Sequence, residues 1–248
     1  MIKYSAVTDI GLHRENNQDS YLTVINNYGD FLALVCDGIG GAKAGDVASG
    51  KVSSYFDNEF KKAKAFTSLE DAKNFIIKHI SIVNKEIHDL SVKYKKFEGM
   101  GTTVTGLLIT KYGVLSINIG DSRVYGFLDD KLFRLTNDHT LVNEMLEKGE
   151  ITYEISLIHP KRHYLTRAVG VWKDVECDVH EVKKMDYYLL CSDGLCGYIS
   201  DNDILNIIIN NNDFPTCEDK TKKLLEKTLM EGGPDNITVV VVSSDEDC

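Results

Sequence analysis

The spacing of hydrophobic residues predicts separate blocks of strands and helices in the first part of the chain. Apolar runs predict strands at 2–8, 20–26 and 31–36, and the last of these, FLALVC, is continuous enough for burial on both faces of a sheet. Apolar residues then recur every three or four positions, which predicts helices from about 44 to 63 and from 68 to 95. The chain therefore begins with strands and continues with a pair of long helices.

Strands dominate the middle of the chain and return at its end. Apolar runs predict them at 102–110, 113–119, 123–128, 131–136, 187–192 and 237–242. Asp129 and Asp130 would join two neighbouring strands as a tight hairpin, and we expect the central strands to form a meander. Shorter helices are predicted at about 141–148, 201–211 and 217–230.

The segment from about Gly149 to Gly170 has the spacing of neither a helix nor a strand. It contains Pro160 and is expected to be irregular. A loop of this length is usually functional or mobile.

Helices and strands come in blocks rather than in alternation along the chain. This order favours α+β layers with mainly antiparallel sheets over a doubly wound parallel sheet, in which the two would alternate. No linker, repeat array or low-complexity segment interrupts the 248 residues, so we expect a single domain over residues 1–244. The last residues, 245–248, are mostly acidic, and we expect them to form a frayed tail.

Composition and charge exclude several classes of protein. With 43% hydrophobic and 27% charged residues, the chain has the composition of a globular protein. A formal net charge of -10 argues against binding to nucleic acid, whose phosphates attract a basic face. No apolar run approaches the ~20 residues of a membrane span. The N-terminal residues lack the layout of a secretory signal, and the 6 cysteines form no CxxC pair, so we expect a cytoplasmic protein with reduced thiols and no membrane contact.

Four aspartates stand at places where a fold can position them accurately. Asp37, Asp121 and Asp193 each follow an apolar strand, and Asp235 lies just before the last one. If these strand ends converge, the carboxylates would raise one another's pKa unless a cation neutralised them. Oxygen ligands of this kind suit Mg²⁺ or Mn²⁺, and no His- or Cys-rich spacing indicates zinc. A single Asp-Gly pair is more often a simple turn, and only its recurrence after buried strands favours a metal site.

Two such cations would suit hydrolysis of a phosphate ester. A hydroxide that bridges two metals is a strong nucleophile near neutral pH, and paired metals stabilise the leaving oxygen in an in-line attack on phosphorus. An arginine would supply selectivity for phosphate, because its planar donors match two phosphate oxygens, and Arg14 lies close in sequence to Asp19. For an arginine taken alone, an exposed ion pair is the commoner role.

Eight segments of the chain resemble, in the same order, the motifs of a known family. They are TDIGLHRENNQDS, LALVCDGIGGAKAGDVAS, GMGTTVTGLL, NIGDSRVY, LTNDHTLV, HPKRHYLTRAVG, LLCSDGL and GGPDNITVVVV. Together they resemble the metal-dependent serine/threonine protein phosphatases of the 2C type (the PPM family), in particular their compact bacterial branch. The resemblance covers nearly the whole chain, and eight motifs in register are specific although each one alone is weak.

The resemblance implies a fold, an activity and a set of partners. The fold would be a four-layer α/β/β/α sandwich, with two antiparallel sheets face to face, helices outside, and metals in a cleft at one end of the sheets. The segment at about 143–170 corresponds to the family's flap beside that cleft and is expected to influence substrate choice. The activity would be hydrolysis of phosphoserine and phosphothreonine in proteins by a monomeric enzyme that opposes a serine/threonine kinase.

The resemblance also assigns the core metal ligands. Asp37 would bridge two core ions, Mn²⁺ or Mg²⁺, and the Gly38 carbonyl would complete the shell of the second. Asp193 and Asp235 would bind the first ion.

Further residues match the outer part of the site. Asp19 would act through metal-bound water, and Asp121 would hold a third, weaker ion together with Asp193. Arg14 would clamp the phosphate. Arg14, Asp37 and Asp193 are thus the residues predicted to carry catalysis, by attack of the metal-bridging hydroxide on phosphorus.

The sequence departs from the family pattern at two places. Ile39 stands where the animal enzymes have a histidine considered as a general acid, so a metal-bound water is the expected proton donor. Gln18 stands where many relatives have Glu. His139 could donate the proton instead, although a histidine that only hydrogen-bonds near a strand end is the commoner case. Two alternatives stay open: a pseudophosphatase that docks phosphoproteins without turnover, and a phosphatase for small phosphomonoesters.

Overall fold

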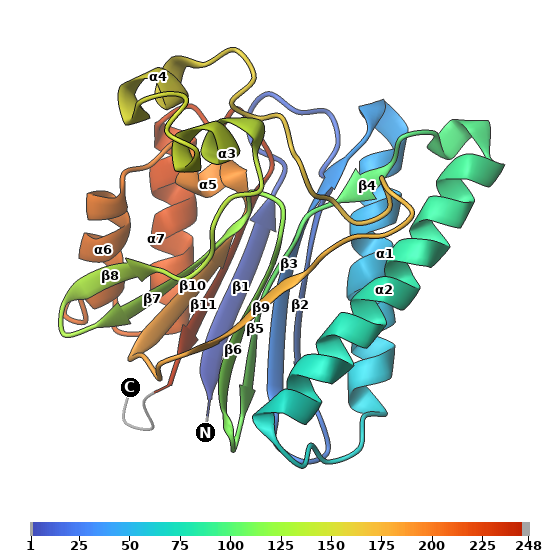
Figure 1. Cartoon of the computed structure of the whole chain (residues 1–248). Helices are drawn as coiled ribbons and strands as arrows, with labels where there is room; N and C mark the ends of the chain where they lie inside the picture. Colours follow the sequence, from blue (N-terminus) through green and yellow to red (C-terminus); the bar gives the residue numbers. More distant parts are fainter. Residues whose placement is uncertain (1, 245–248) are drawn as a thin grey trace.

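Two antiparallel β-sheets packed face to face form the middle of the computed structural model (Figure 1). The structure describes residues 2–244, without the side chains of residues 41–43, and the predicted tail at 245–248 lies outside the described residues. The first sheet has the order β1 (Lys3–Asp9), β11 (Ile237–Ser243), β10 (Tyr187–Cys191), β7 (Arg123–Leu128) and β8 (Lys131–Arg134). The second has the order β2 (Asp19–Ile25), β3 (Phe31–Ile39), β5 (Val104–Thr110), β6 (Gly113–Ile119) and β9 (Asp178–Val182), and β4 (Gly101–Thr102) pairs with β3.

Helices cover the outer face of each sheet. α1 (Gly41–Lys61) and α2 (Leu69–Lys93) lie on the second sheet, followed by the 3-10 turn η1 (Lys95–Phe97), as Figure 1 shows. On the first sheet lie α5 (Asp193–Cys196), α6 (Asp201–Ile209) and α7 (Cys217–Met230). The layers are therefore α/β/β/α, and the predicted fold class is confirmed.

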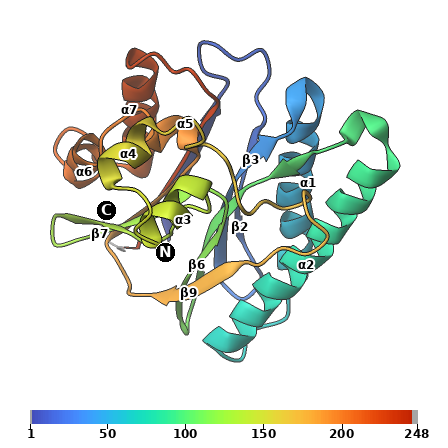
Figure 2. The ribbon, with the colours of Figure 1, turned by 45° about the horizontal axis from the view of Figure 1, so that its top comes forward.

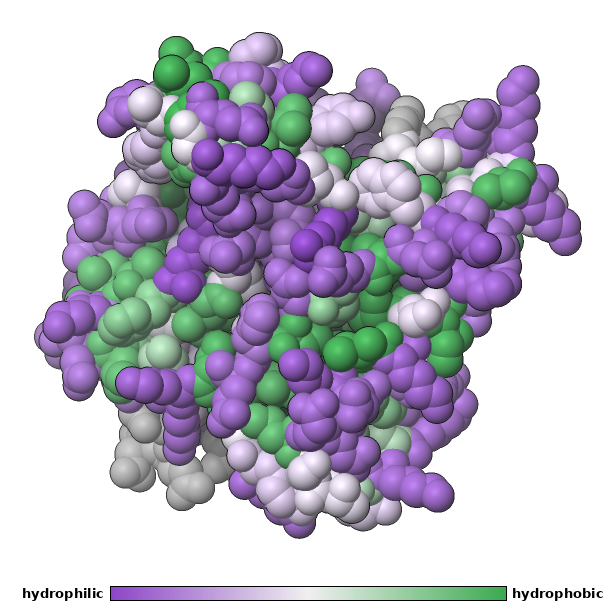
Figure 3. All heavy atoms as spheres, in the orientation of Figure 1, coloured by the Kyte–Doolittle hydropathy of each residue, from purple (hydrophilic) through white to green (hydrophobic). Residues whose placement is uncertain are grey.

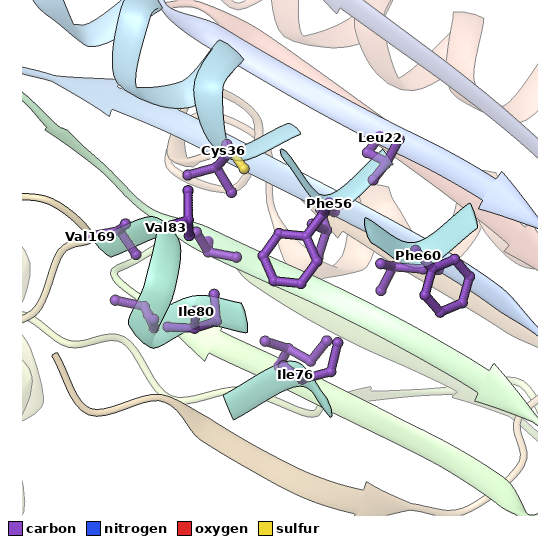
Figure 4. Close-up of a cluster of buried hydrophobic side chains, with 14 of the residues drawn as sticks. Leu22, Cys36, Phe56, Phe60, Ile76, Ile80, Val83 and Val169 are labelled. Atoms are coloured by element: carbon purple, nitrogen blue, oxygen red, sulfur yellow. The ribbon is translucent and has the colours of Figure 1, made fainter. Parts of the chain in front are cut away.

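Each helical layer buries an apolar stripe against its sheet. Figure 4 shows this on the second sheet, where Phe56 and Phe60 of α1 meet Ile76, Ile80 and Val83 of α2, all at most 1% exposed. The stripe on α2 arises from apolar residues three or four positions apart, which place these side chains on one face of the helix. Full burial of each such side chain stabilises the fold by roughly 1.5–3 kcal/mol.

Strand β3 is buried on both faces, as its apolar run predicted. Leu32, Leu34 and Cys36 point toward the helices, and the alternate residues lie between the two sheets. Successive side chains of a strand point to opposite faces, so a strand between two layers needs apolar residues at every position. β3 thus has a rigid backbone where it leaves the core.

The predicted meander of central strands is wrong. β5 and β6 pair in the second sheet, whereas β7 and β8 pair in the first, and β6 has no pairing with β7. The chain changes sheet at Gly120–Ser122, where Gly120 has a positive φ of 110°. The tight hairpin at Asp129 and Asp130 is confirmed, since both residues have the positive φ of a primed turn.

The segment predicted to be irregular contains a helix. After α3 (Leu141–Glu147), which the sequence predicted, comes α4 (Tyr153–Ile158). Thr152 caps the start of α4, because its side chain accepts a hydrogen bond from the Ile155 amide. With six residues, α4 is too short to show a helical period. β9 was also missed, because only two of its five residues, Val179 and Val182, are apolar.

The helices α3 and α4 lie at one end of the two sheets. Figure 2 shows them at the same end as α5 and as the loop between β1 and β2. Asp19, Asp121 and Asp193 stand at or next to element ends that reach this place. The fold therefore directs these aspartates toward one end of the sandwich.

Candidate active site

Asp37 and Asp19 lie opposite each other on neighbouring strands. In the antiparallel ladder between β2 and β3, Asp19 is the direct partner of Asp37. Directly opposed residues in such a ladder have Cβ atoms about 4.5–5.5 Å apart. Like charges so placed repel each other, so this pairing destabilises the fold unless a proton or a cation intervenes.

The backbone around Asp37 belongs to the strand, not to a turn. The sequence predicted that the strand ends at Cys36, but β3 continues to Ile39. The Asp37 amide donates to the Thr103 hydroxyl over 2.9 Å, and the Asp37 carbonyl accepts from the Thr103 amide over 2.8 Å. These bonds hold the carboxylate on a rigid backbone, as a precise ligand requires.

Gly38 occupies a place that no side chain could fill. A Cβ atom there would lie 2.3 Å from the Gly45 carbonyl oxygen of α1 and 2.6 Å from the Gln18 carbonyl oxygen. The glycine therefore allows close packing between β3, β2 and α1. The predicted role of its carbonyl as a metal ligand stays a prediction.

Two hydroxyl groups orient the carboxyl group of Asp19. Its Oδ2 accepts hydrogen bonds from Ser192 Oγ at 2.8 Å and from Thr238 Oγ1 at 2.7 Å. Its Oδ1 is buried and has no hydrogen-bond partner. An acidic oxygen of this kind costs free energy unless something neutralises it. Burial, opposed by the two hydroxyls, raises the pKa of Asp19 to about 7.

The other carboxylates are partly buried and influence one another. Burial raises the pKa of Asp37 well above its usual value, and the charges of Asp19, Asp193, Asp121 and Asp235 raise it further. Burial is also the main cause of the raised pKa values of Asp121 and Asp193. The structure thus brings together the four aspartates that the sequence singled out, with Asp19 as a fifth.

Asp193 lies near both Asp37 and Asp235. It begins helix α5, directly after β10 and Ser192. Burial and the charge of Asp235 raise the pKa of Asp193, and the side chain of Asp37 lowers it, so these carboxyl groups influence one another directly. Gly194 lets the start of α5 approach the chain before β11, because a Cβ atom there would lie 1.9 Å from the Asn236 carbonyl oxygen.

Arg14 and Asp235 form an ion pair at the open side of the group. Arg14 Nη2 lies 2.7 Å from Asp235 Oδ2, and the Arg14 side chain is 52% exposed. The electrostatic influence of Asp193 and Asp37 also reaches the guanidinium. The ion pair that is common for arginines is therefore present, but its partner belongs to the aspartate group.

His163 is a neighbour of the site that the sequence analysis did not single out. Its Nδ1 lies 3.9 Å from Asp193 Oδ2, and its side chain is 60% exposed. It comes from the chain that returns from α4, inside the motif HPKRHYLTRAVG. Its position in that motif was the available signal, but no local pattern distinguished it from the neighbouring His159.

His139 uses both ring nitrogens in hydrogen bonds. Nδ1 accepts from the Gly120 amide at 3.1 Å, and Nε2 lies 3.0 Å from Asp178 Oδ2. The side chain is buried. The interpretation of His139 as a histidine that hydrogen-bonds near a strand end is confirmed.

The side chains of Asp19, Asp37, Asp121, Asp193 and Asp235 suit hard divalent cations, because they offer oxygen ligands and negative charge. All five are carboxylates, and Asp19 Oδ1 is a buried oxygen without a partner. Within residues 2–244, no three or more His, Cys, Asp or Glu side chains lie close enough together to hold a metal ion as they stand. The aspartates fit such ions by chemistry. The raised pKa values of Asp19, Asp37, Asp121 and Asp193 agree with this, because a cation would offset the repulsion between their negative charges.

Comparison with known proteins agrees with this geometry. The family model for protein phosphatase 2C matches residues 13–231. The chain belongs to the protein phosphatase 2C family. Like other members it is a serine/threonine protein phosphatase, and this family is metal-dependent. The serine/threonine phosphatase stp of Listeria monocytogenes serotype 4b is 36% identical over 240 residues, which cover 96% of this chain and 94% of that protein.

Solved structures of PP2C phosphatases share the fold. The serine/threonine phosphatase Stp1 from Staphylococcus aureus aligns with a TM-score of 0.91 and 32% identity, over 99% of this chain and 96% of that one. The catalytic domain of the phosphatase PstP, in complex with two manganese ions, aligns with a TM-score of 0.82 and 32% identity, over 98% of this chain and 97% of that one. These alignments extend over both sheets and their helices.

The raised pKa of Asp19 predicts how the stability of this PP2C phosphatase depends on pH. The folded-state pKa of about 7 exceeds the unfolded value. Between these values the folded protein keeps a proton that the unfolded chain has lost. The stabilisation of the folded state by this proton on Asp19 is therefore complete below the unfolded pKa, near 4, and is lost as pH rises through 7. For the metal-free protein, we expect Asp19 to lower the free energy of unfolding by about 1 kcal/mol from pH 6 to pH 8, or roughly 3 °C in Tm.

Thermal melts in a chelator at pH 6 and pH 8 would measure this effect. The variant Asp19→Asn is the control, because it keeps the shape of the side chain without the titration. The fall in Tm with pH should be about 3 °C larger in the wild type than in the variant. An equal fall in both proteins would contradict the prediction.

Proposed function

We propose that this phosphatase hydrolyses phosphoserine and phosphothreonine in proteins at the aspartate group, with divalent cations bound there. The supporting observation is the convergence of partly buried carboxylates from distant parts of the chain, with one buried oxygen of Asp19 left without a partner. Two divalent cations, Mn²⁺ or Mg²⁺, would when bound supply an ionised water as nucleophile and neutralise charge on the phosphate.

The core ligands in this proposal are Asp37, Asp193 and Asp235. Asp37 lies centrally, since four other aspartates influence its carboxylate, and it would bridge the two core ions. The Gly38 carbonyl would complete the shell of one ion, and Asp193 with Asp235 would bind the other. Because Asp37 sits on a rigid strand, its position would change little when ions bind.

Asp19 and Asp121 would serve the outer part of the site. The Asp19 carboxylate is held by Ser192 and Thr238, so its partnerless Oδ1 is presented in a fixed direction. Asp121 follows β6, and after burial the charge of Asp193 is the largest cause of its raised pKa. We propose that Asp19 acts through metal-bound water, and that Asp121 together with Asp193 holds a third, weaker ion.

Arg14 would clamp the phosphate. Its guanidinium lies at the open side of the group and is half exposed, so it can exchange Asp235 for a phosphate ester without leaving the site. A guanidinium offers paired donors that match two phosphate oxygens. The exposed Arg14 would thereby bind the substrate and orient it toward the aspartates.

The flap would influence substrate choice. Ile155, Leu157 and Ile158 of α4 are exposed, and Figure 3 shows apolar side chains gathered at the upper left, over this helix. The flap also carries His163, close to Asp193. A phosphorylated protein bound at Arg14 would therefore meet apolar side chains beside its phosphate.

The proposal extends to organisation and partners. We propose one phosphatase domain over residues 1–244 with a flap at about 143–170, acting as a monomer on phosphoproteins and opposing a serine/threonine kinase. Within residues 2–244, none of the helices combines the length and the apolar character that a membrane crossing requires. We propose a role in cytoplasmic signalling.

The function is tested with a phosphothreonine peptide and purified protein. With Mn²⁺ present we expect release of phosphate, a loss of at least about 100-fold on chelation, and recovery when Mn²⁺ is restored. A phosphotyrosine peptide and an aryl phosphate should be hydrolysed with lower kcat/KM. Binding of the phosphothreonine peptide without turnover would contradict the proposal and favour a docking module, and equal or better use of the aryl phosphate would favour a small-molecule substrate.

A further inference from the structure

The turn that carries Asp121 is held from outside by His139. Gly120, directly before Asp121, has a φ of 110°, a conformation that L side chains rarely adopt. Its amide donates to His139 Nδ1 at 3.1 Å, and its carbonyl accepts from the His139 amide at 2.9 Å. The Asn118 side chain adds a third bond to the same carbonyl at 3.2 Å. Both backbone groups of Gly120 are thus engaged, and His139 contributes two of the three bonds.

These bonds define which nitrogen of His139 carries the proton. The Gly120 amide can only donate, so Nδ1 must be the unprotonated, accepting nitrogen. Nε2 then carries the proton and donates to Asp178 Oδ2 at 3.0 Å. Burial lowers the pKa of His139, which keeps the ring neutral and supports this tautomer. The two ring nitrogens of His139 therefore have different partners and different roles.

The far side of His139 belongs to the base of the flap. The His139 carbonyl accepts from the Thr166 amide at 2.9 Å, and the next residue, Thr140, forms a bridge with Leu165. Asp178 is also bound by Arg167 Nη1 at 2.8 Å. The chain that enters the flap and the chain that leaves it thus meet at His139.

We propose that His139 is a positioning residue that holds the Gly120–Asp121 turn against the base of the flap, so that the Asp121 carboxylate is presented to a divalent cation. This inference rests on the proposed role of Asp121 in holding the third ion. Asp121 itself forms none of the bonds to His139 described above, so the histidine acts through the Gly120 backbone. The placement of the flap and the affinity of the weaker ion are coupled through this one ring.

Two substitutions test the hydrogen bonds of Nδ1 and Nε2 one at a time. In His139→Asn the amide oxygen can take the place of Nδ1 and accept from Gly120, while the link to Asp178 is lost. In His139→Gln the amide nitrogen can reach the place of Nε2 and donate to Asp178, while the acceptor for Gly120 is lost. Asn is one methylene smaller than Gln, so a general loss of packing would harm His139→Asn more than His139→Gln, which is the reverse of the order expected below for the ion.

The first measurement is Mn²⁺ binding to the full chain by calorimetry, with Asp121→Asn as reference. We expect His139→Gln to weaken the weakest class of Mn²⁺ site by about tenfold, as loss of a supporting hydrogen bond typically does, and His139→Asn to stay within about twofold of wild type. Equal affinities in the two His139 variants would overturn the coupling to the ion.

The second measurement is amide hydrogen exchange without metal, which does not depend on any metal role. The segment with Gly120 should exchange faster in His139→Gln, and the flap base around Thr166 faster in His139→Asn. The same pattern in both variants would overturn the positioning role. If Asp121→Asn leaves Mn²⁺ binding unchanged, the third-ion role of Asp121 fails together with the cation part of this inference, and the exchange pattern alone then decides whether His139 holds the turn.

Discussion

Replacing Asp193 by alanine should lower kcat/KM for a phosphothreonine peptide by about 1,000-fold or more, equivalent to roughly 4 kcal/mol of transition-state stabilisation. Asp193 is partly buried, its pKa is influenced by Asp235 and Asp37, and it is proposed to bind both a core ion and the third ion. Its loss would remove ligands from two ions at once. The measurement is steady-state hydrolysis at saturating Mn²⁺.

Stability measurements separate this effect from unfolding. Asp193 adds negative charge to a crowded, partly buried set of aspartates, so the metal-free Asp193→Ala protein should melt at the same temperature as wild type or higher. The rise in Tm on adding Mn²⁺ should be reduced, because fewer ligands favour the folded state.

Asp57→Ala is the matched control for Asp193→Ala. Asp57 forms an exposed ion pair with Lys61 on α1, far in sequence from the group. Its loss should cost less than about 1 kcal/mol of stability and leave kcat/KM unchanged. An active Asp193→Ala enzyme, or an Asp57→Ala enzyme that is equally impaired, would contradict the assignment.

Replacing Arg14 by alanine should lower kcat/KM by about 100-fold, close to 3 kcal/mol, which is the range of a charge-assisted hydrogen bond to phosphate. Most of the change should be in KM, and the inhibition constant of inorganic phosphate should rise by a similar factor. Both quantities report the contact between the guanidinium and a phosphate group. Arg14→Lys should recover only part of the loss, because an ammonium lacks the planar pair of donors.

The ion pair between Arg14 and Asp235 offers a competing role for this arginine. If Arg14 only supports Asp235, Arg14→Ala should change the affinity for Mn²⁺ and leave KM and phosphate inhibition unaltered. Calorimetry with Mn²⁺ alone therefore distinguishes the two roles. A change in metal affinity without a change in KM would remove Arg14 from the phosphate site.

Much of the fold could be predicted from apolar spacing, because that spacing reports which side of an element is buried. The strand at 113–119 and the helix at 217–230 agree with β6 and α7 at both ends. Weakly patterned elements were missed: α4 is too short to show a period, and β9 has too few apolar residues. The change of sheet between β6 and β7 was missed for a different reason, because the same apolar alternation suits either sheet.

In the candidate site, too, some features could be predicted from the sequence and others could not. Local sequence identified Asp37, Asp121, Asp193 and Asp235 as acids next to buried strands, and the motifs in register identified the family. Their roles as metal ligands stay predictions, and so does the phosphate clamp. His163 lay inside a recognised motif, yet its approach to Asp193 depends on how the chain after α4 folds back.

By itself the sequence determined the type of each strong element, the acids available and the family to which the chain belongs. Only the tertiary structure decided that Asp19 lies opposite Asp37, that Ser192 and Thr238 orient Asp19, and that Arg14 reaches Asp235 across 221 positions of the chain. The physical reason is the distance along the chain over which each signal acts. Hydrophobic spacing records the burial of one element at a time, whereas the meeting of side chains from different elements depends on how whole layers pack together.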